Sequence, residues 1–218
     1  GMPHAPPMKF LALRYLLSVL CFLAWAWLAR AAWPRGRVQW GHLAVTGVLM
    51  HAGYLGGVWA AVKAGMGAGL AALLVGLQPV LTALWIAARG GQVAARQWTG
   101  LALGLLGLLL VVWEKLGFGE VHPMNLAFAL LALVAITAGT LYQKRFVAPC
   151  DVRTANLVQL AAAFVVTLPL ALAESETMRW SLPGGAVNGE LVGAMAWSVL
   201  ALTLGGSSLL YLLIQRGA

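Results

Sequence analysis

Seven long apolar runs dominate this sequence and leave few folds open to it. They cover residues 8–28, 43–62, 66–88, 97–113, 123–143, 154–173 and 191–215. About 20 helical residues are needed to cross ~30 Å of hydrocarbon, and each run is close to that length. Five runs contain no Asp, Glu, Lys, Arg or His, while the first holds Arg14, with Lys9 at its start, and the second holds His51. The pattern predicts an all-α, polytopic bundle of seven transmembrane helices.

Composition excludes a soluble protein. Charged residues make up 9% of the chain and apolar residues 61%, whereas soluble domains carry about 25% charged residues. The net charge of +8 does not indicate a nucleic-acid partner, because the 14 basic residues lie singly or in pairs between the apolar runs. We therefore expect the lipid bilayer to be the surrounding solvent and expect no nucleic acid to bind.

The charges of the loops predict an orientation. The first, third and fifth loops carry eight Lys or Arg residues between them, and the alternate loops carry one each. Those alternate loops also hold five of the six acidic residues. Because basic residues beside membrane spans favour the cytoplasmic side, residues 1–7 are expected outside and Arg216 inside.

Polar side chains inside the runs are the candidate substrate-binding residues, because polar groups are costly in the middle of a bilayer. His51 lies near the middle of the second run, and Tyr54 follows at i+3 on the same helical face. Gln78 lies in the middle of the third run, next to a helix-breaking proline. We expect these three residues to converge at midplane depth. The alternative for each is a hydrogen bond between helices with no ligand.

Arg14 is the fourth candidate for substrate binding. It lies one to two turns inside the first run. The alternative is an anchoring role, in which the long side chain reaches the outer headgroups.

The sequence lacks the usual signals of an active site, a metal site or a phosphate-binding loop. No carboxylate lies inside the runs, and the four histidines do not have metal-ligand spacing. The glycines at 65, 67 and 69 lack the Lys-Ser/Thr sequel of a phosphate-binding loop. Cys21 and Cys150 are far apart and are expected to be free thiols. We therefore expect no enzyme activity, no metal and no cofactor.

Small residues predict close helix packing in the fourth run. Gly100 and Gly104 form a GxxxG pair, and Gly107 lies one turn later. Such faces let helix backbones approach closely in lipid, so tight packing is expected there.

Four segments resemble one family of membrane proteins. They are PHAPPMKFLALRYLL from Pro3, HAGYLGGVWAAVKAGMGAGLAALLVGLQPVLTAL from His51, QWTGLALGLLGLLLVV from Gln97 and SSLLYLLIQRGA from Ser207. In this order they resemble helices two, three to four, five and eight of EamA-type transporters in the drug/metabolite transporter superfamily. The resemblance spans nearly the whole chain and includes an arginine at the position of Arg14.

The resemblance implies ten helices arranged as two inverted repeats of five. The seven runs would be helices two to eight, with residues 1–120 in the first repeat and 121–218 in the second. The chain is thus expected to be a fragment that lacks the first and the last two helices, and to be inactive in transport by itself. The family's Gly-Glu pair after the fourth helix is replaced by Gly90-Gly91, so a role for that acidic residue is in doubt here.

The expected function is secondary transport. The resemblance implies alternating access that exports small metabolites or amino-acid-like compounds across the bacterial inner membrane. An intramembrane enzyme and a non-transporting membrane subunit are the alternatives. The oligomeric state is left open, with a homodimer as one alternative.

Overall fold

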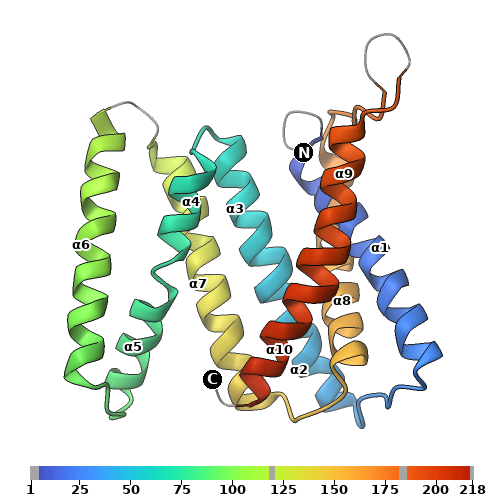
Figure 1. The fold of residues 1–218 in the computed structure, drawn as a ribbon, viewed down its shortest axis with the longest axis horizontal. Coiled ribbons are helices and arrows are strands. Elements are labelled where there is room, and N and C mark those ends of the chain that lie inside the picture. Colours follow the sequence, from blue (N-terminus) through green and yellow to red (C-terminus); the bar gives the residue numbers. More distant parts are fainter. Residues whose placement is uncertain (1–4, 118–120, 182–185, 217–218) are drawn as a thin grey trace. The chain divides into compact units, whose positions relative to one another are not determined.

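The regular secondary structure is helical in the part that the computed structural model describes, which is residues 5–117, 121–181 and 186–216 (Figure 1). Within these ranges there is no β-strand, and the only β-type contact is an isolated bridge between Ser181 and Val187. The described residues contain seven helical spans that are long and apolar enough to cross a membrane: Pro7–Leu28, Arg37–Lys63, Ala68–Ala88, Ala95–Trp113, Pro123–Phe146, Val152–Ala173 and Gly189–Gln215. The predicted all-α fold with seven spans is confirmed.

Local sequence signals fix where several helices begin. α1 (Pro7–Leu28) starts with a proline, which has no N–H and so leaves no unpaired donor at the first position of the helix. α8 (Val152–Ala173) is capped by Asp151, whose side chain accepts a hydrogen bond from the Arg153 amide at 2.9 Å. In the same way, Asn188 accepts from the Leu191 amide at the start of α9 (Gly189–Trp197).

The chain divides into two compact units. Unit 1 contains Gly1–Ala52 and Tyr142–Ala218, and unit 2 contains Gly53–Leu141. Unit 1 therefore holds α1, α2 (Arg37–Gly47), α8, α9 and α10 (Ser208–Gln215). Unit 2 holds α3 (Tyr54–Lys63), α4 (Ala68–Val75), α5 (Gln78–Ala88), α6 (Ala95–Gly117) and most of α7 (Pro123–Phe146). The two sequence repeats, 1–120 and 121–218, stay a prediction.

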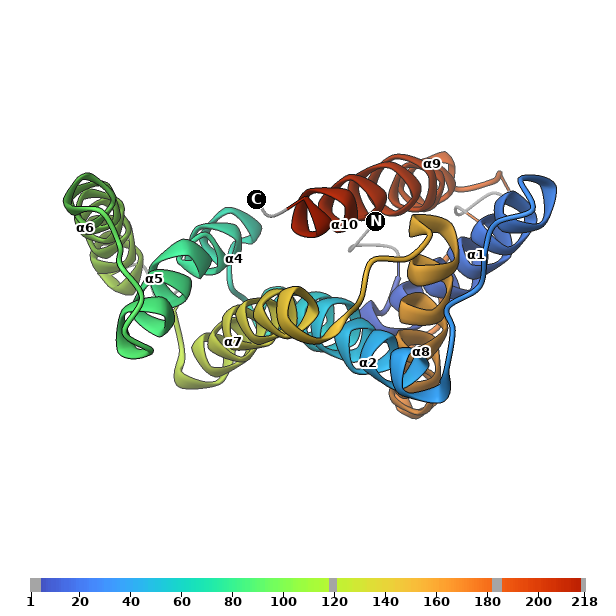
Figure 2. The ribbon, with the colours of Figure 1, turned by 90° about the horizontal axis from the view of Figure 1, so that it is seen from below.

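In unit 1, α8 packs against α1, α2 and α10 (Figures 1 and 2). Leu43, Ala155, Val158 and Tyr211 form a buried apolar cluster where α2, α8 and α10 meet. Gly47 on α2 lies directly on the α8 backbone, because a Cβ at this position would overlap the main chain of Gln159. The absence of a side chain at Gly47 thus permits the close approach of α2 and α8.

In unit 2, α4 packs against α3 and α6. The buried side chains of this core are Ala61, Met66, Leu70, Ala71, Leu74, Leu108 and Ala129. A second close approach joins α3 to α7, because a Cβ on Gly57 would lie 2.9 Å from the carbonyl oxygen of Phe128.

The third span is not one continuous helix. α4 ends at Val75 and α5 begins at Gln78, with Gly76 and Leu77 between them. Leu77 donates to the Leu74 carbonyl at 3.1 Å, which is a tighter turn than an α-helix makes. Pro79 lacks an N–H and so cannot continue the hydrogen-bond ladder of α4. The single continuous run of residues 66–88 expected from the sequence is therefore two helices that meet inside the span.

The second and seventh spans each contain a π-helical segment near their middle. In the second span, η2 (Val48–Gly53) separates α2 from α3. In the seventh span, η3 (Ser198–Ser207) separates α9 from α10. Such i→i+5 segments are rare and frequently mark functional positions inside helices. Hydropathy does not distinguish them from α-helix, and the sequence did not predict them.

The small-residue face of α6 has no packing partner among the described residues. A Cβ added at Gly100, Gly104 or Gly107 would meet no atom within 4 Å. The tight packing predicted for this face is therefore not found in the described part of the chain.

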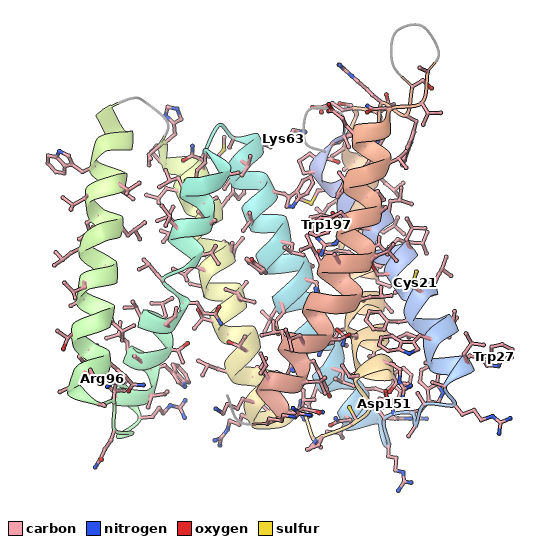
Figure 3. All side chains as sticks on the ribbon, in the orientation of Figure 1. Cys21, Trp27, Lys63, Arg96, Asp151 and Trp197 are labelled. Carbon is pink, nitrogen blue, oxygen red and sulfur yellow. The ribbon has the colours of Figure 1, made fainter. Side chains whose placement is uncertain are left out.

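Several tryptophans lie near the ends of the spans, where membrane interfaces favour them. Trp27 near the end of α1 is 78% exposed and projects away from the helix (Figure 3). Trp33 and Trp40, on the connection to α2 and on α2 itself, stack with ring planes 4° apart. This aromatic cluster lies beside Arg35 and Arg37 and agrees with a position at the headgroup level.

Candidate functional site: polar contacts inside unit 1

One face of α1 carries polar groups into the interior of unit 1. Leu11, Tyr15, Ser18 and Phe22 follow one another at helical spacing and are completely buried. Arg14 is beside them and is only 7% exposed. The buried face of α1 is therefore apolar at both ends and polar in the middle.

Tyr15 holds the π-helical segment of the second span. Its hydroxyl donates to the backbone carbonyl of His51 at 2.9 Å. The Tyr15 and His51 rings also meet edge to face, with centroids 6.1 Å apart. His51 lies near the middle of its 27-residue span and is buried. The contact thus fixes both the backbone and the ring of His51.

Arg14 contacts the π-helical segment of the seventh span. Its Nε donates to the Thr203 hydroxyl at 3.0 Å, and that hydroxyl donates to the Ser198 carbonyl at 2.8 Å. Thr203 is buried near the middle of a 27-residue span. The Arg14 side chain is therefore buried and bonded to a residue near the middle of the seventh span, and its role in substrate binding or in anchoring stays a prediction.

A second set of polar groups lies on α8 and at the end of α7. Gln159 on α8 donates to the Gln143 side-chain oxygen at 3.4 Å and also interacts with the His51 side chain. Asn156, one turn before Gln159, is buried on the same face of α8. Amides thus extend the polar interior of unit 1 beyond His51.

Several of these buried groups have an atom without a hydrogen-bond partner. Within the described residues, the four such side-chain atoms are Ser18 Oγ, Gln143 Nε2, Asn156 Oδ1 and Ser208 Oγ. All four belong to unit 1. Since buried polar groups are normally hydrogen-bonded, their shared location favours unit 1 as the place where a polar ligand or water binds.

In unit 2, Gln78 lies at the break of the third span. Its Nε2 donates to the Thr140 hydroxyl on α7 at 3.2 Å. Thr82 in turn donates to the Gln78 carbonyl at 2.9 Å. The Gln78 side chain therefore links α5 to α7, which is the interhelical bond that the sequence left open as an alternative. Tyr54, at the start of α3, is partly buried.

The four predicted site residues divide between the units. Arg14 and His51 belong to unit 1, where Tyr15, the neighbour of Arg14 in sequence, bonds the His51 carbonyl. Tyr54 and Gln78 belong to unit 2. Convergence of His51, Tyr54 and Gln78 on one cavity stays a prediction.

The sequence pattern did not predict a role for five of these residues, Tyr15, Ser18, Asn156, Gln159 and Gln143. An available signal was the i, i+3 spacing of the two amides within the sixth apolar run, which places both on one helical face. Tyr15 and Ser18 gave less signal, because both residue types are common in membrane helices without a functional role.

Comparison with known proteins now identifies the chain. Residues 1–113 match the model of the EamA-like transporter family. The chain belongs to the EamA-like transporter family. No solved structure matches this EamA-like chain.

Two relatives extend the similarity beyond residue 113. The "Uncharacterized inner membrane transporter YedA" of Escherichia coli is 26% identical over 203 residues, which cover 93% of the EamA-like chain and 65% of that relative. The "Probable amino-acid metabolite efflux pump" of Salmonella typhimurium is 25% identical over 173 residues, covering 79% of the chain and 56% of that relative. The chain thus spans less than two thirds of the length of either protein.

Proposed function

We propose that this protein is a secondary transporter that moves small metabolites across the bacterial inner membrane, in the export direction, by alternating access. Membership of the EamA-like family and the names of its relatives, an inner membrane transporter and an efflux pump, support the reaction class. The observation that carries the proposal is the pair of contacts from α1, by Arg14 and Tyr15, to the two π-helical segments.

These contacts place polar groups where a carrier needs them. Transporter sites lie near the bilayer midplane and use interrupted helices, whose backbone geometry departs from the α-helix beside the substrate. His51 and Thr203 lie near the middle of their spans, each within a π-helical segment. A purely structural bundle does not require a buried arginine at that depth.

The same segments supply the mobility that alternating access needs. A π-helix returns to α-helix when one residue shifts in register, and the third span is already interrupted at Gly76 and Leu77. We expect the spans to bend at these points while α1 and α8 move as a packed pair.

Transport is favoured over the enzyme alternative. Among the described residues, no three His, Cys, Asp or Glu side chains are grouped to hold a metal ion. Both relatives are named as transport proteins. In the sequence of the spans, His51 is the histidine that lies near mid-depth. We therefore propose a carrier without a catalytic step.

The test is a transport assay on the complete reading frame. Cells that express it should release small metabolites, amino acids among them, faster than cells with an empty vector. His51→Gln, Tyr54→Phe and Gln78→Leu should each slow release several-fold while membrane insertion and thermal stability stay close to wild type.

Stability and transport must be measured on the same preparations. If the three variants lose stability in parallel with activity, the residues pack helices and do not bind substrate. Equal metabolite release with and without the protein would contradict transport itself.

A further inference from the structure

We infer that the connection between α1 and α2 is a binding site for the headgroup of an anionic phospholipid. Arg30, Arg35 and Arg37 hold the phosphate, and exposed apolar side chains beside them contact the glycerol and the acyl chains. The site lies at the end of unit 1 where α1 ends and α8 begins. It belongs to unit 1 alone and does not depend on the proposed transport function.

This end of unit 1 has an excess of positive charge without a counter-charge. The first 113 residues contain no Asp or Glu. Asp151, which precedes α8, is already bonded through both carboxylate oxygens to Arg153. The other acidic residues of unit 1 lie beyond the far end of α8.

The three arginines of the connection have no partner of this kind. Their side chains are exposed, and within the described residues they make no hydrogen bond and no ion pair. Three cationic groups within eight residues create a local positive potential that attracts anions. In a membrane protein, the anions at this depth are the headgroups of acidic lipids.

The main chain of the connection is held in place by α8 and α2. The Thr154 hydroxyl on α8 donates to the Ala32 carbonyl at 2.9 Å. The Trp40 indole on α2 donates to the Pro34 carbonyl at 3.0 Å. The arginines therefore extend from an ordered segment, so binding a headgroup does not require the backbone to be ordered first.

Arg30 occupies a backbone position that favours glycine. Its φ of 47° lies in the left-handed region, which is strained for a residue with a side chain. The Ala31 amide donates to the Ala26 carbonyl at 2.8 Å, in the helix-ending pattern that usually has glycine at the position of Arg30. An arginine at such a position points to a use for its guanidinium.

Exposed apolar side chains adjoin the arginines. Trp27 and Leu28, in the last turn of α1, are both exposed, and Figure 3 shows Trp27 projecting away from the helix. Trp33 and Trp40 stack with ring centroids 5.8 Å apart. Indole rings favour the headgroup level of a bilayer. Guanidinium groups beside exposed apolar side chains match a phospholipid better than a soluble anion, which would use the arginines alone.

The chemistry of the site favours lipids with a net negative charge. Arginine binds phosphate oxygens through paired N–H groups and stays charged at every physiological pH. A zwitterionic headgroup carries its own cation, which the arginines repel. Phosphatidylglycerol should therefore bind more tightly than phosphatidylcholine.

The experiment measures lipid binding to the purified protein. The complete reading frame is expressed and purified in a neutral detergent, and bound lipids are counted by native mass spectrometry during titration. The probes are dioleoyl-phosphatidylglycerol and dioleoyl-phosphatidylcholine, with inorganic phosphate as a competitor. The first phosphatidylglycerol should bind at least about fivefold more tightly than phosphatidylcholine, and millimolar phosphate should not displace it.

A triple variant removes the proposed phosphate contacts. With Arg30→Gln, Arg35→Gln and Arg37→Gln combined, the affinity for phosphatidylglycerol should fall to about that for phosphatidylcholine. The affinity for phosphatidylcholine itself should change little.

A second triple variant is the matched control. Arg89→Gln, Arg96→Gln and Arg179→Gln together remove the same charge at three other exposed positions. The affinity for the first phosphatidylglycerol should change by less than about twofold, because charges far from the headgroup are screened.

Arg30→Gly separates lipid recognition from a structural role. Glycine adopts the φ of this position without strain, so the Tm without added lipid should stay the same or rise. The affinity for phosphatidylglycerol should nevertheless fall several-fold. This variant also tests the site if the first triple variant does not fold.

Three results would each overturn the inference. The first is equal affinity for the two lipids, and the second is an equal loss in the two triple variants. The third is displacement of phosphatidylglycerol by inorganic phosphate, which would show that the arginines bind phosphate without the lipid. An unchanged affinity in Arg30→Gly would equally contradict the role of Arg30.

Discussion

Tyr15 and His51 show how a buried side chain can stabilise an unusual backbone. A π-helical turn leaves carbonyl oxygens less well paired than an α-helical turn does. The Tyr15 hydroxyl satisfies the His51 carbonyl at 2.9 Å, and the edge-to-face rings bury both side chains. The residue pair therefore supports the geometry of the second span at its middle, where no water is available to replace the bond.

Removing that hydroxyl should affect transport more than stability. Tyr15→Phe keeps the ring contact and loses one hydrogen bond, worth about 0.5–1.5 kcal/mol. We expect a decrease of a few degrees in Tm and a several-fold loss of transport, because His51 loses its fixed position. Thermal unfolding in detergent and transport in vesicles measure the two effects.

Tyr142→Phe is the matched control, since Tyr142 also bonds a histidine, His42 Nδ1 at 2.8 Å, but near the end of the spans. It should lower Tm by a similar amount with little effect on transport. If the two variants reduce transport equally, Tyr15 has no special role.

Asp151 combines a helix cap with an ion pair. Its carboxylate accepts from the Arg153 amide and from the Arg153 guanidinium, at 2.7 Å for the ion pair. These bonds to Arg153 lower the pKa of Asp151 below its ordinary value of 3.8. A lowered pKa means that the stabilisation is present at neutral pH and is lost as the pH falls through the folded-state pKa.

Asp151→Asn should therefore destabilise the protein in a pH-dependent way. Asn remains a good N-cap, so the variant loses mainly the partly exposed ion pair, and the loss of stability at pH 7 should be small. The difference in unfolding temperature between wild type and variant should shrink as the pH is lowered below 4. A difference that stays constant down to acid pH would show that the carboxylate charge contributes nothing.

At the scale of helices, the contacts of individual glycines decide where spans approach closely. Gly47 touches the α8 backbone in unit 1, and Gly57 touches α7 in unit 2. Gly100 and Gly104 match the GxxxG pattern better, yet they face no atom within 4 Å. Sequence spacing predicts which residues share a face, but the packing of the helices decides which face is used.

Alanine substitutions should reveal this difference. Gly47→Ala should lower Tm by several degrees, since α2 and α8 must separate to accommodate a methyl group. Gly104→Ala should be neutral or slightly stabilising, because alanine is the better helix former and space is open. Thermal unfolding of both variants in one detergent gives the comparison. Equal losses at the two positions would contradict the packing of unit 1.

At the scale of the molecule, the loops that meet at one end of unit 1 are those that the charge pattern places on the same side of the membrane. Gln39 on α2 pairs with the backbone of Ala148, and Gln215 on α10 bonds the Cys150 carbonyl. The first loop, the fifth loop and the end of α10 thus share one end of the unit. The Lys9 amide donates to the Glu174 carboxylate. Lys9 begins α1 and Glu174 follows α8, so this contact lies at the end of the unit away from these loops.

The orientation in the membrane follows as a prediction. In a background without Cys21 and Cys150, single cysteines at positions 35 and 92 should react only with reagent added to the cytoplasmic side. A cysteine at position 177 should react only from outside, as should one at position 119, which lies outside the described residues. The reason is the excess of basic residues in the first, third and fifth loops. Labelling of position 177 from the cytoplasmic side alone would reverse the orientation.

The sequence by itself determined the fold class, the seven spans and the family. Hydropathy determines spans because the energy of placing a side chain in hydrocarbon depends on that residue alone. His51 and Arg14 could be selected for the same reason, since polar residues are costly at mid-depth wherever the helices pack.

Only the tertiary structure decided which polar groups meet. It paired Arg14 with Thr203 and Tyr15 with the His51 carbonyl, gave Gln78 the partner Thr140, and left Ser18 without one. It also produced the π-helical segments and interrupted the helix of the third span after Val75. These features depend on contacts between residues as far apart as 14 and 203. No local pattern encodes such contacts, because each partner is supplied by a different helix.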